Sequence, residues 1–134
     1  IKDRLIDFLR LHISTIGGLT PARKLAALYE AFNVRTAWHG SADVSPVGHA
    51  ANLMLDMNVW NFGVQEASCY LNTNETLKEV FPGVPEVRGG YMWPSGKPGL
   101  GVDINEQLAA KYPLKDTRLR EESSRRPDGT VTRP

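Results

Sequence analysis

The order of apolar and polar residues in the first half of the chain predicts three strands separated by two helices. Strand-like segments rich in β-branched and aromatic residues cover residues 7–13, 34–38 and 59–65. Helical spacing of apolar residues follows Pro21 and Pro46, and each proline comes directly after a hydroxyl residue that can cap a helix. Strands and helices that alternate through short links are typical of a parallel sheet with right-handed crossovers. We therefore predict the α/β class.

The second half of the chain loses this alternation and predicts a C-terminal extension over residues 67–134. Short helices are expected at residues 74–80 and 105–112, with a brief strand at 102–104. Residues 81–101 are rich in proline and glycine but also carry aromatic residues, so an ordered excursion is expected there. The remainder is a polar, charged tail.

The predicted sheet is incomplete as an independent domain. Three parallel strands leave two open edges, and a parallel sheet normally has both faces covered. The chain also begins at Ile1 and not at Met. We therefore expect residues 1–66 to be the last three βα units of a larger TIM-like barrel, with residues 67–134 following as an extension.

Four polar residues lie where such a barrel would place its chemistry. His39 and Glu66 each follow an apolar strand, and in (β/α) barrels the active site lies at the C-terminal ends of the strands. Arg10 lies on the polar face of the first strand, which would point into the barrel, and Asp43 lies in the loop after His39. This placement predicts an enzyme.

Each of these residues also has a structural interpretation. His39 could be a core histidine, and Asp43 could be a turn residue. Because an unpaired buried carboxylate is costly, Glu66 could form a salt bridge to Arg10 or Arg35, which would also make Arg10 an ion-pair partner. The residues alone leave these alternatives open.

Composition excludes several classes of function. A net charge of +1 over 134 residues does not favour a nucleic-acid-binding protein, and no apolar run approaches the roughly 20 residues of a membrane helix. Cys69 is the single cysteine, so an internal disulfide is impossible and no zinc-type cysteine cluster is present. A reducing, cytoplasmic location is the simpler expectation.

A resemblance to a known family is carried by five segments: DFLRLHISTIGGLTPARKLAAL, TAWHGSADVSPVGHAAN, NFGVQE, GYMWPSGKPGLGVDI and RRPDGTV. They resemble the C-terminal part of the mannonate dehydratase group of the enolase superfamily, which includes starvation-sensing RspA-like sugar-acid dehydratases. The resemblance covers nearly the whole chain. It implies a (β/α)7β barrel, with the N-terminal capping domain and the first barrel strands outside this chain and the tail returning to the capping domain.

The activity implied by this resemblance is that of a Mg²⁺-dependent hydro-lyase. Such an enzyme removes the α-proton and the β-hydroxyl of D-mannonate and/or D-gluconate, giving 2-keto-3-deoxy-gluconate. The implied metal ligands (one Asp and two Glu) and the acid/base Tyr and His would precede Ile1. This chain is therefore expected to supply neither catalytic nor metal-binding residues.

Two alternatives stand beside that activity. The first is a catalytically weak or inactive family member with a regulatory or binding role, and the second is another acid-sugar dehydratase or racemase of the same superfamily. The implied partners are a small-molecule sugar acid, the remainder of the same enzyme and further copies in a homo-oligomer, with no nucleic acid and no membrane.

The resemblance also assigns residues within this chain. Arg10 matches the family's strand arginine, His39 and Asp43 match a His-x-x-x-Asp motif, and Glu66 matches the glutamate of the last barrel strand. The family uses these four in substrate binding and polarisation. Ser41 departs from the pattern, in which Ala or Pro is usual.

Overall fold

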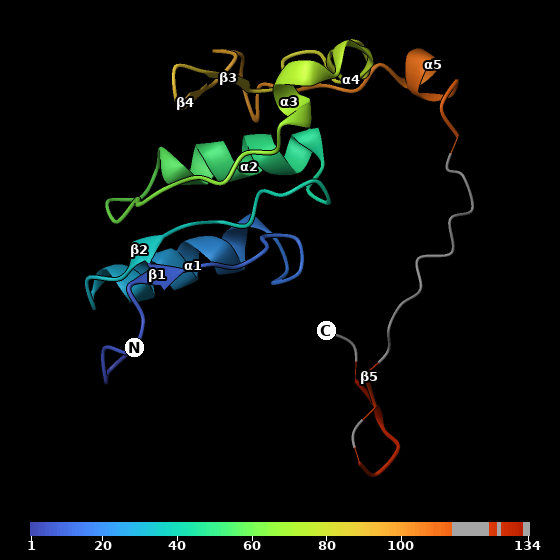
Figure 1. Cartoon of the computed structure of the whole chain (residues 1–134). Helices are drawn as coiled ribbons and strands as arrows, with labels where there is room; N and C mark the ends of the chain where they lie inside the picture. The colour runs from blue at the N-terminus through green and yellow to red at the C-terminus, as the bar shows by residue number, and fades with distance from the viewer. Residues whose placement is uncertain (114–123, 126, 133–134) are drawn as a thin grey trace.

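The computed structural model describes residues 1–113, 124–125 and 127–132. Its elements are β1 (Phe8–Leu9), α1 (Leu19–Glu30), β2 (Arg35–Thr36), α2 (Pro46–Asp56), α3 (Tyr70–Thr73), α4 (Glu75–Val80), β3 (Glu86–Arg88), β4 (Tyr91–Trp93), α5 (Glu106–Ala109), β5 (Ser124–Arg125) and β6 (Val131–Thr132). Figure 1 shows β1 and β2 beside α1, with α2 as the next layer and α3, α4 and the β3–β4 hairpin beyond it. Much of the predicted charged tail lies outside the described residues.

The first two predicted strands pair in parallel, as expected. Leu9 lies opposite Thr36 in the register of β1 and β2. The hydrogen bonding extends past the regular strands, since the Ala37 N–H donates to the Leu9 carbonyl at 2.9 Å and the His39 N–H donates to the Leu11 carbonyl at 3.0 Å. The two segments therefore remain paired as far as Arg10 and His39, two of the predicted site residues.

The predicted third strand, residues 59–65, does not form as a regular strand. Its ladder with β2 is reduced to one parallel bridge, between Thr36 and Phe62. Part of the pairing is taken over by a side chain, because the Asn61 amide donates to the Val34 carbonyl at 2.8 Å. The order of the three segments is nevertheless that of a parallel sheet with α1 and α2 as crossovers.

The two predicted helices form, and one of them begins where expected. Ser45 caps α2 by accepting a hydrogen bond from the Gly48 N–H at 3.0 Å, and proline occupies the first turn. The prediction that Thr20 caps α1 is wrong: the helix already begins at Leu19, after Gly18. Gly18 has a φ of 102°, which glycine adopts without a steric penalty.

The core lies between the strands and the helices. It combines residues of the β1 segment, α1, the β2 segment and α2: Leu9, Ile13, Ala22, Ala26, Val34, Trp38 and Leu55. Leu9 is 3% exposed whereas its neighbour Phe8 is 45% exposed, as expected because adjacent residues of a strand point to opposite faces.

The second half of the chain forms short elements. The helix predicted at residues 74–80 is confirmed as α4, with Asn74 as its cap, and the later predicted helix is shortened to α5. The strand predicted at 102–104 is wrong, because this segment makes loop hydrogen bonds such as the one from the Asp103 N–H to the Pro82 carbonyl at 3.0 Å.

Two antiparallel hairpins and one additional helix were not expected. The β3–β4 hairpin pairs Glu86 with Trp93, and the Arg88 guanidinium carbon lies 4.7 Å from the centre of the Trp93 ring. The β5–β6 hairpin pairs Arg125 with Val131. Within the described ranges, every helix is too short or too polar to cross a lipid bilayer.

Candidate functional site

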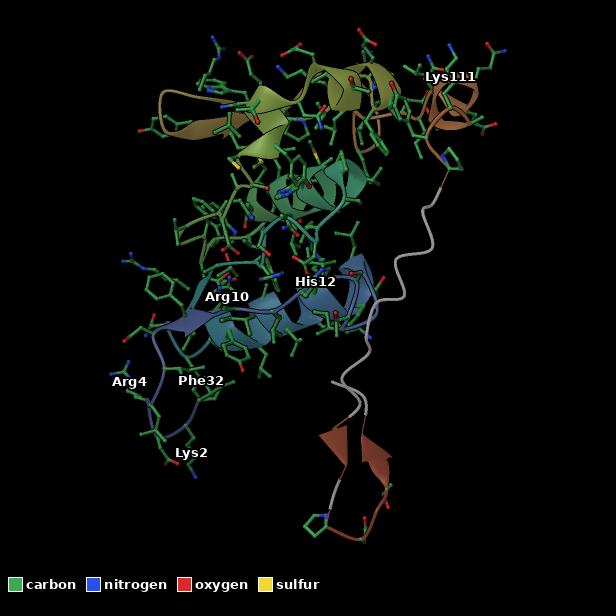
Figure 2. All side chains as sticks on the ribbon, turned by 45° about the vertical axis from the view of Figure 1, so that its right-hand side comes forward. Lys2, Arg4, Arg10, His12, Phe32 and Lys111 are labelled. Atoms are coloured by element: carbon green, nitrogen blue, oxygen red, sulfur yellow. The ribbon has the colours of Figure 1, made fainter. Side chains whose placement is uncertain are left out.

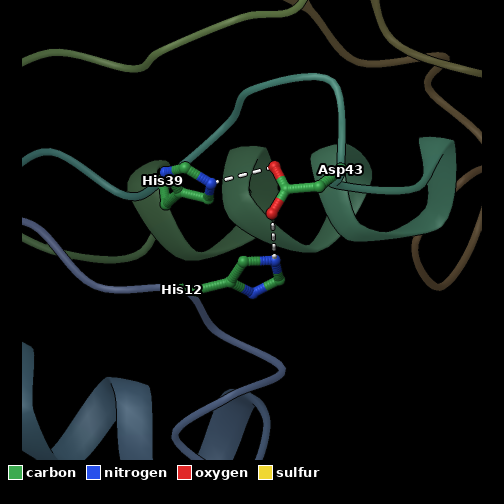
Figure 3. Close-up of side chains that lie close together, drawn as sticks. All are labelled: His12, His39 and Asp43. Atoms are coloured by element: carbon green, nitrogen blue, oxygen red, sulfur yellow. Dashed lines mark hydrogen bonds and ion pairs between the residues drawn. The ribbon is translucent and has the colours of Figure 1, made fainter. Parts of the chain in front are cut away.

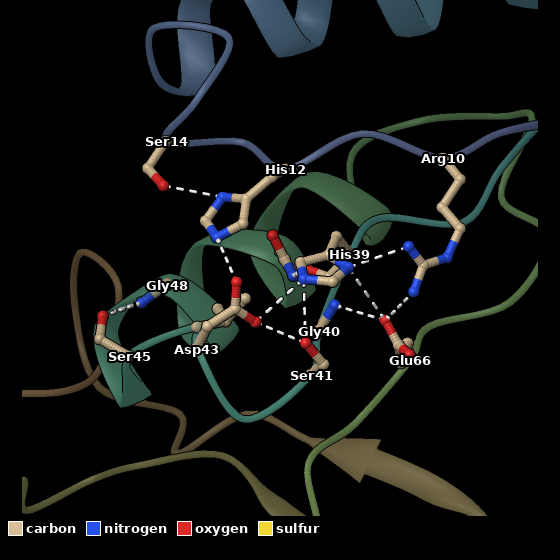
Figure 4. Close-up of polar contacts among 12 residues, drawn as sticks. Arg10, His12, Ser14, His39, Gly40, Ser41, Asp43, Ser45, Gly48 and Glu66 are labelled. Carbon is tan, nitrogen blue, oxygen red and sulfur yellow. Dashed lines mark hydrogen bonds and ion pairs between the residues drawn. The ribbon is translucent and has the colours of Figure 1, made fainter. Parts of the chain in front are cut away.

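The structure brings the four predicted site residues together at one end of the parallel segments. Arg10 follows β1, His39 follows β2, and Glu66 follows the bridge at Phe62. Asp43 reaches the same place from the loop before α2, as Figure 4 shows. This is the edge of a parallel sheet at which barrel enzymes place substrates.

Glu66 accepts hydrogen bonds from two donors on one side of the site. Its Oε2 atom accepts hydrogen bonds from Arg10 Nη2 at 2.7 Å and from the Gly40 N–H at 2.8 Å. The Gly40 N–H and the Arg10 guanidinium hold the pKa of the Glu66 carboxyl below its usual range, against the opposing effect of desolvation. Glu66 is therefore an ionised acceptor at neutral pH.

Arg10 determines the tautomer of His39. Arg10 Nη1 lies 2.9 Å from His39 Nδ1, and because a guanidinium only donates, Nδ1 must accept. Neutral His39 then carries its proton on Nε2, which lies 2.9 Å from Asp43 Oδ1 and donates to it. The result is a directed chain of hydrogen bonds from Arg10 through His39 to Asp43.

Ser41 joins this chain at Asp43. Its hydroxyl donates to Asp43 Oδ1 and lies 2.9 Å from His39 Nε2. The Ser41 hydroxyl, followed by His39, lowers the pKa of the Asp43 carboxyl to about 2. Ser41, where the resemblance implied Ala or Pro, therefore contacts two of the predicted site residues directly.

The loop that carries these residues is fixed from two sides. A Cβ atom at Gly40 would lie 1.9 Å from the Glu66 carbonyl oxygen, so only glycine lets the two segments approach this closely. From α2, the buried Asn52 side chain donates to the His39 carbonyl at 2.9 Å. The loop is positioned by α2 and by the segment that ends in Glu66.

His12 belongs to the same cluster, although its sequence context predicts no role for it. His12 Nε2 lies 3.8 Å from Asp43 Oδ2, and its ring centre lies 5.2 Å from that of His39. Figure 3 shows the three side chains together. Figure 2 shows Arg10 and His12 along the stretch that leads from β1 toward α1. The signal was present, because residues two apart on a strand share a face.

The structural alternatives can now be compared with the geometry. The expected ion pair between Glu66 and Arg10 exists, but their side chains remain 40% and 52% exposed. His39 is not a core histidine, because its side chain is 22% exposed. His49, by contrast, is fully buried on α2, 5.7 Å from the Tyr70 ring, and burial lowers its pKa. The side chains of Arg10 and Glu66 thus both keep surface available for a ligand.

Comparison with known proteins identifies the family to which the chain is similar. The family described as Enolase C-terminal domain-like matches residues 1–108. A D-galactonate dehydratase family member from Musicola paradisiaca is 54% identical over all 134 residues, and the family member RspA from Pantoea ananatis is 53% identical. The chain covers 31% of the length of each of these relatives.

A solved structure shows the same fold. The crystal structure of an enolase from Pantoea ananatis with bound D-gluconate and Mg superposes with a TM-score of 0.83 at 52% identity, over 99% of this chain and 31% of that one. The parallel strands with their crossover helices are thus a portion of an α/β TIM-barrel domain. The family match and the superposition show that the chain belongs to the Enolase C-terminal domain-like family, and the position of the site at the strand ends is consistent with this.

Proposed function

We propose that this chain supplies substrate-binding residues to a larger Mg²⁺-dependent acid-sugar dehydratase. The observation that carries the proposal is the hydrogen-bonded set Arg10, His39, Asp43 and Glu66 at the C-terminal ends of parallel segments. It is supported by the relatives named D-galactonate dehydratase family members and by the related enolase that holds D-gluconate and Mg. D-Gluconate and D-mannonate are the first substrates to test.

The proposed enzyme contains this chain as its last three βα units, residues 1–66, followed by the extension 67–134. Support comes from apolar side chains that the chain itself does not cover: Phe8, Phe62 and Val64 are 45%, 46% and 56% exposed. The chain also spans about a third of the curated relatives. We propose that upstream barrel strands and a capping domain cover these surfaces.

Magnesium fits poorly to the residues present here. Mg²⁺ prefers six oxygen ligands in octahedral geometry. The carboxylates near the site are those of Asp43 and Glu66, and each has a histidine or an arginine beside it in place of further oxygen ligands. Among the described residues, the grouping able to hold an ion contains two histidines and one carboxylate, which does not suit Mg²⁺. We therefore place the Mg²⁺ ligands outside this chain and derive no step through the metal.

The residues of this chain act by binding and orienting the sugar acid. The reaction converts the acid sugar into a 2-keto-3-deoxy acid and water, by loss of the α-proton and the β-hydroxyl. Glu66 can accept hydrogen bonds from sugar hydroxyls, and Arg10 can donate to oxygen atoms of the substrate. The single N–H of neutral His39 would reach a substrate oxygen by exchanging its bond to Asp43. Fixing the substrate in this way brings its reacting atoms to the acid/base groups in a productive geometry.

The test is turnover by the full-length protein with D-gluconate, D-mannonate and D-galactonate, each assayed for the 2-keto-3-deoxy product. Activity should disappear on chelation and return with Mg²⁺. A protein that binds a sugar acid saturably but forms no product would instead support the regulatory or binding role. Absence of both binding and product would reject the proposed site.

A further inference from the structure

His12 brings a second kind of chemistry to the site. His12, His39 and Asp43 each offer one ligand atom, and these atoms lie within 4.8 Å of one another. His12 and Asp43 also line a cavity of about 370 Å³ next to the first turns of α1 and α2. The proposed dehydratase function makes no use of His12.

The orientation of His12 suits a metal ligand. Its Nδ1 lies 2.7 Å from the Ser14 hydroxyl oxygen, and an Nδ1–H that donates to this oxygen leaves a lone pair on Nε2. Nε2 faces Asp43 Oδ2 at 3.8 Å, which is too long for a hydrogen bond. Two ligands of one tetrahedral zinc ion lie roughly 3.3–3.5 Å apart, so this pair would have to close by about half an ångström. The three ligand atoms, which lie within 4.8 Å of one another, would also have to draw together around the ion.

His39 can become the second ligand by changing its tautomer. Metal binding at Nε2 requires that Nε2 lose its proton to solvent and that Nδ1 take one up, so the ring stays neutral. The Nδ1–H would then face Glu66 Oε2, which lies 3.5 Å away. Arg10 Nη1, a donor 2.9 Å from Nδ1, would have to turn away from the ring, while Nη2 keeps its bond to Glu66. Metal-bound histidines usually donate their other N–H to such a carboxylate.

The set of ligands selects the class of ion. Imidazole nitrogens suit Zn²⁺, Co²⁺ and Ni²⁺, whereas Mg²⁺ prefers oxygen ligands alone. Two histidines and one carboxylate that leave a position open for water are a ligand set found in zinc enzymes. The described part of the chain therefore contains a group of ligands that prefers a different metal ion from the one bound at the proposed Mg²⁺ site.

We propose that His12, His39 and Asp43 form a binding site for a zinc-class divalent cation, with Ser14 and Glu66 orienting the two imidazoles. The site is separate from the Mg²⁺ site of the proposed dehydratase. It shares His39 and Asp43 with the proposed substrate site, but it does not depend on that activity, because it is defined by ligand geometry within this chain.

Cobalt is a suitable probe because four-coordinate Co²⁺ with nitrogen ligands absorbs visible light far more strongly than octahedral Co²⁺ with oxygen ligands. The metal-free full-length protein would be equilibrated with an excess of Mg²⁺ and titrated with Co²⁺. We expect intense visible bands that saturate at one Co²⁺ per chain and are abolished by added Zn²⁺. Absence of intense bands in the wild-type protein would overturn the proposal.

Variants identify the ligands. His12→Asn and Asp43→Asn should each abolish the intense bands, and thermal melts show whether each variant is folded. Ser14→Ala keeps all three ligands and removes only the partner of His12 Nδ1, so its affinity for Co²⁺ should fall by about 10–100-fold. Glu79→Gln removes an exposed carboxylate on α4 and should bind Co²⁺ as the wild type does. Bands that survive in folded His12→Asn and Asp43→Asn proteins would overturn the assignment.

Discussion

Glu66 is the residue on which the proposed substrate site depends most. Glu66→Gln keeps the shape but removes the charge that Arg10 and the Gly40 N–H both contact. Loss of such contacts typically costs about 1–3 kcal/mol, or roughly 5–150-fold in kcat/KM. We expect a fall of this size with D-gluconate or D-mannonate in the full-length enzyme, and nearly unchanged Mg²⁺ affinity.

His39→Asn should have a similar effect, because asparagine cannot both accept from Arg10 and reach Asp43 as the imidazole does. Steady-state kinetics and a Mg²⁺ titration check both variants, with Glu79→Gln as a surface control. If turnover is unaffected, these residues lie outside the site. If Mg²⁺ binding is lost, they belong to the metal site instead.

The positions of Arg10, His39, Asp43 and Glu66 could be predicted because each has a strong local signal: a strand end, or a loop directly after one. His12 was missed because its partner Asp43 is 31 positions further along the chain and a histidine on a strand has many uses. The tautomer of His39 was also beyond prediction, since it depends on which donor meets Nδ1 in space.

Asp56 gives a prediction about pH. It is 7% exposed at the end of α2, and desolvation raises the pKa of its carboxyl from 3.8 to about 7, with Trp38 and Thr36 opposing part of this effect. The folded state therefore binds this proton more tightly than the unfolded state. Asp56 should destabilise the fold progressively as pH rises from about 4 to about 7, by up to about 4 kcal/mol.

Asp56→Asn should remove this dependence. The stability of the variant relative to wild type should increase between pH 4 and pH 7, as measured by urea unfolding of the full-length protein at a series of pH values. Asp103→Asn, at an exposed carboxylate, is the matched control. A wild type and an Asp56→Asn variant with parallel pH profiles would show that Asp56 ionises normally.

At the scale of elements, α2 is the element that positions the site. Ser45 caps it, and its Asn52 holds the His39 carbonyl. Ser45→Ala should destabilise the protein by about 1 kcal/mol through loss of the cap, whereas Ser45→Asn should retain most of the stability. Denaturant unfolding of both variants tests this, and equal stability of the alanine and asparagine variants would contradict it.

Elements with a clear local signal were predicted more accurately than those set by distant contacts. The cap of α2 was visible in the sequence as Ser45 followed by proline. The β3–β4 hairpin lies in a proline- and glycine-rich segment whose pairing is not apparent from alternation. The segment 59–65 was expected to be a strand, but the Asn61 side chain takes part of the backbone pairing, which no periodicity reveals.

At the scale of the whole molecule, the exposed apolar residues predict how the chain behaves alone. Phe8, Phe62 and Val64 are about half exposed, and the parallel pairing ends in open edges. We expect residues 1–134 expressed alone to lack a sharp thermal transition. Calorimetry and amide NMR check this, and a cooperative melt with dispersed amide signals would show that the chain folds independently.

The close approach of Gly40 to the Glu66 carbonyl bears on how substrate preference could be changed. Position 40 admits no side chain, so variation there would separate two segments of the barrel. Its neighbour Ser41 faces His39 and Asp43 through its hydroxyl alone. Within one short loop, one position is closed to variation and the next is open. A library that aims at new acid sugars should therefore diversify position 41 and leave position 40 untouched.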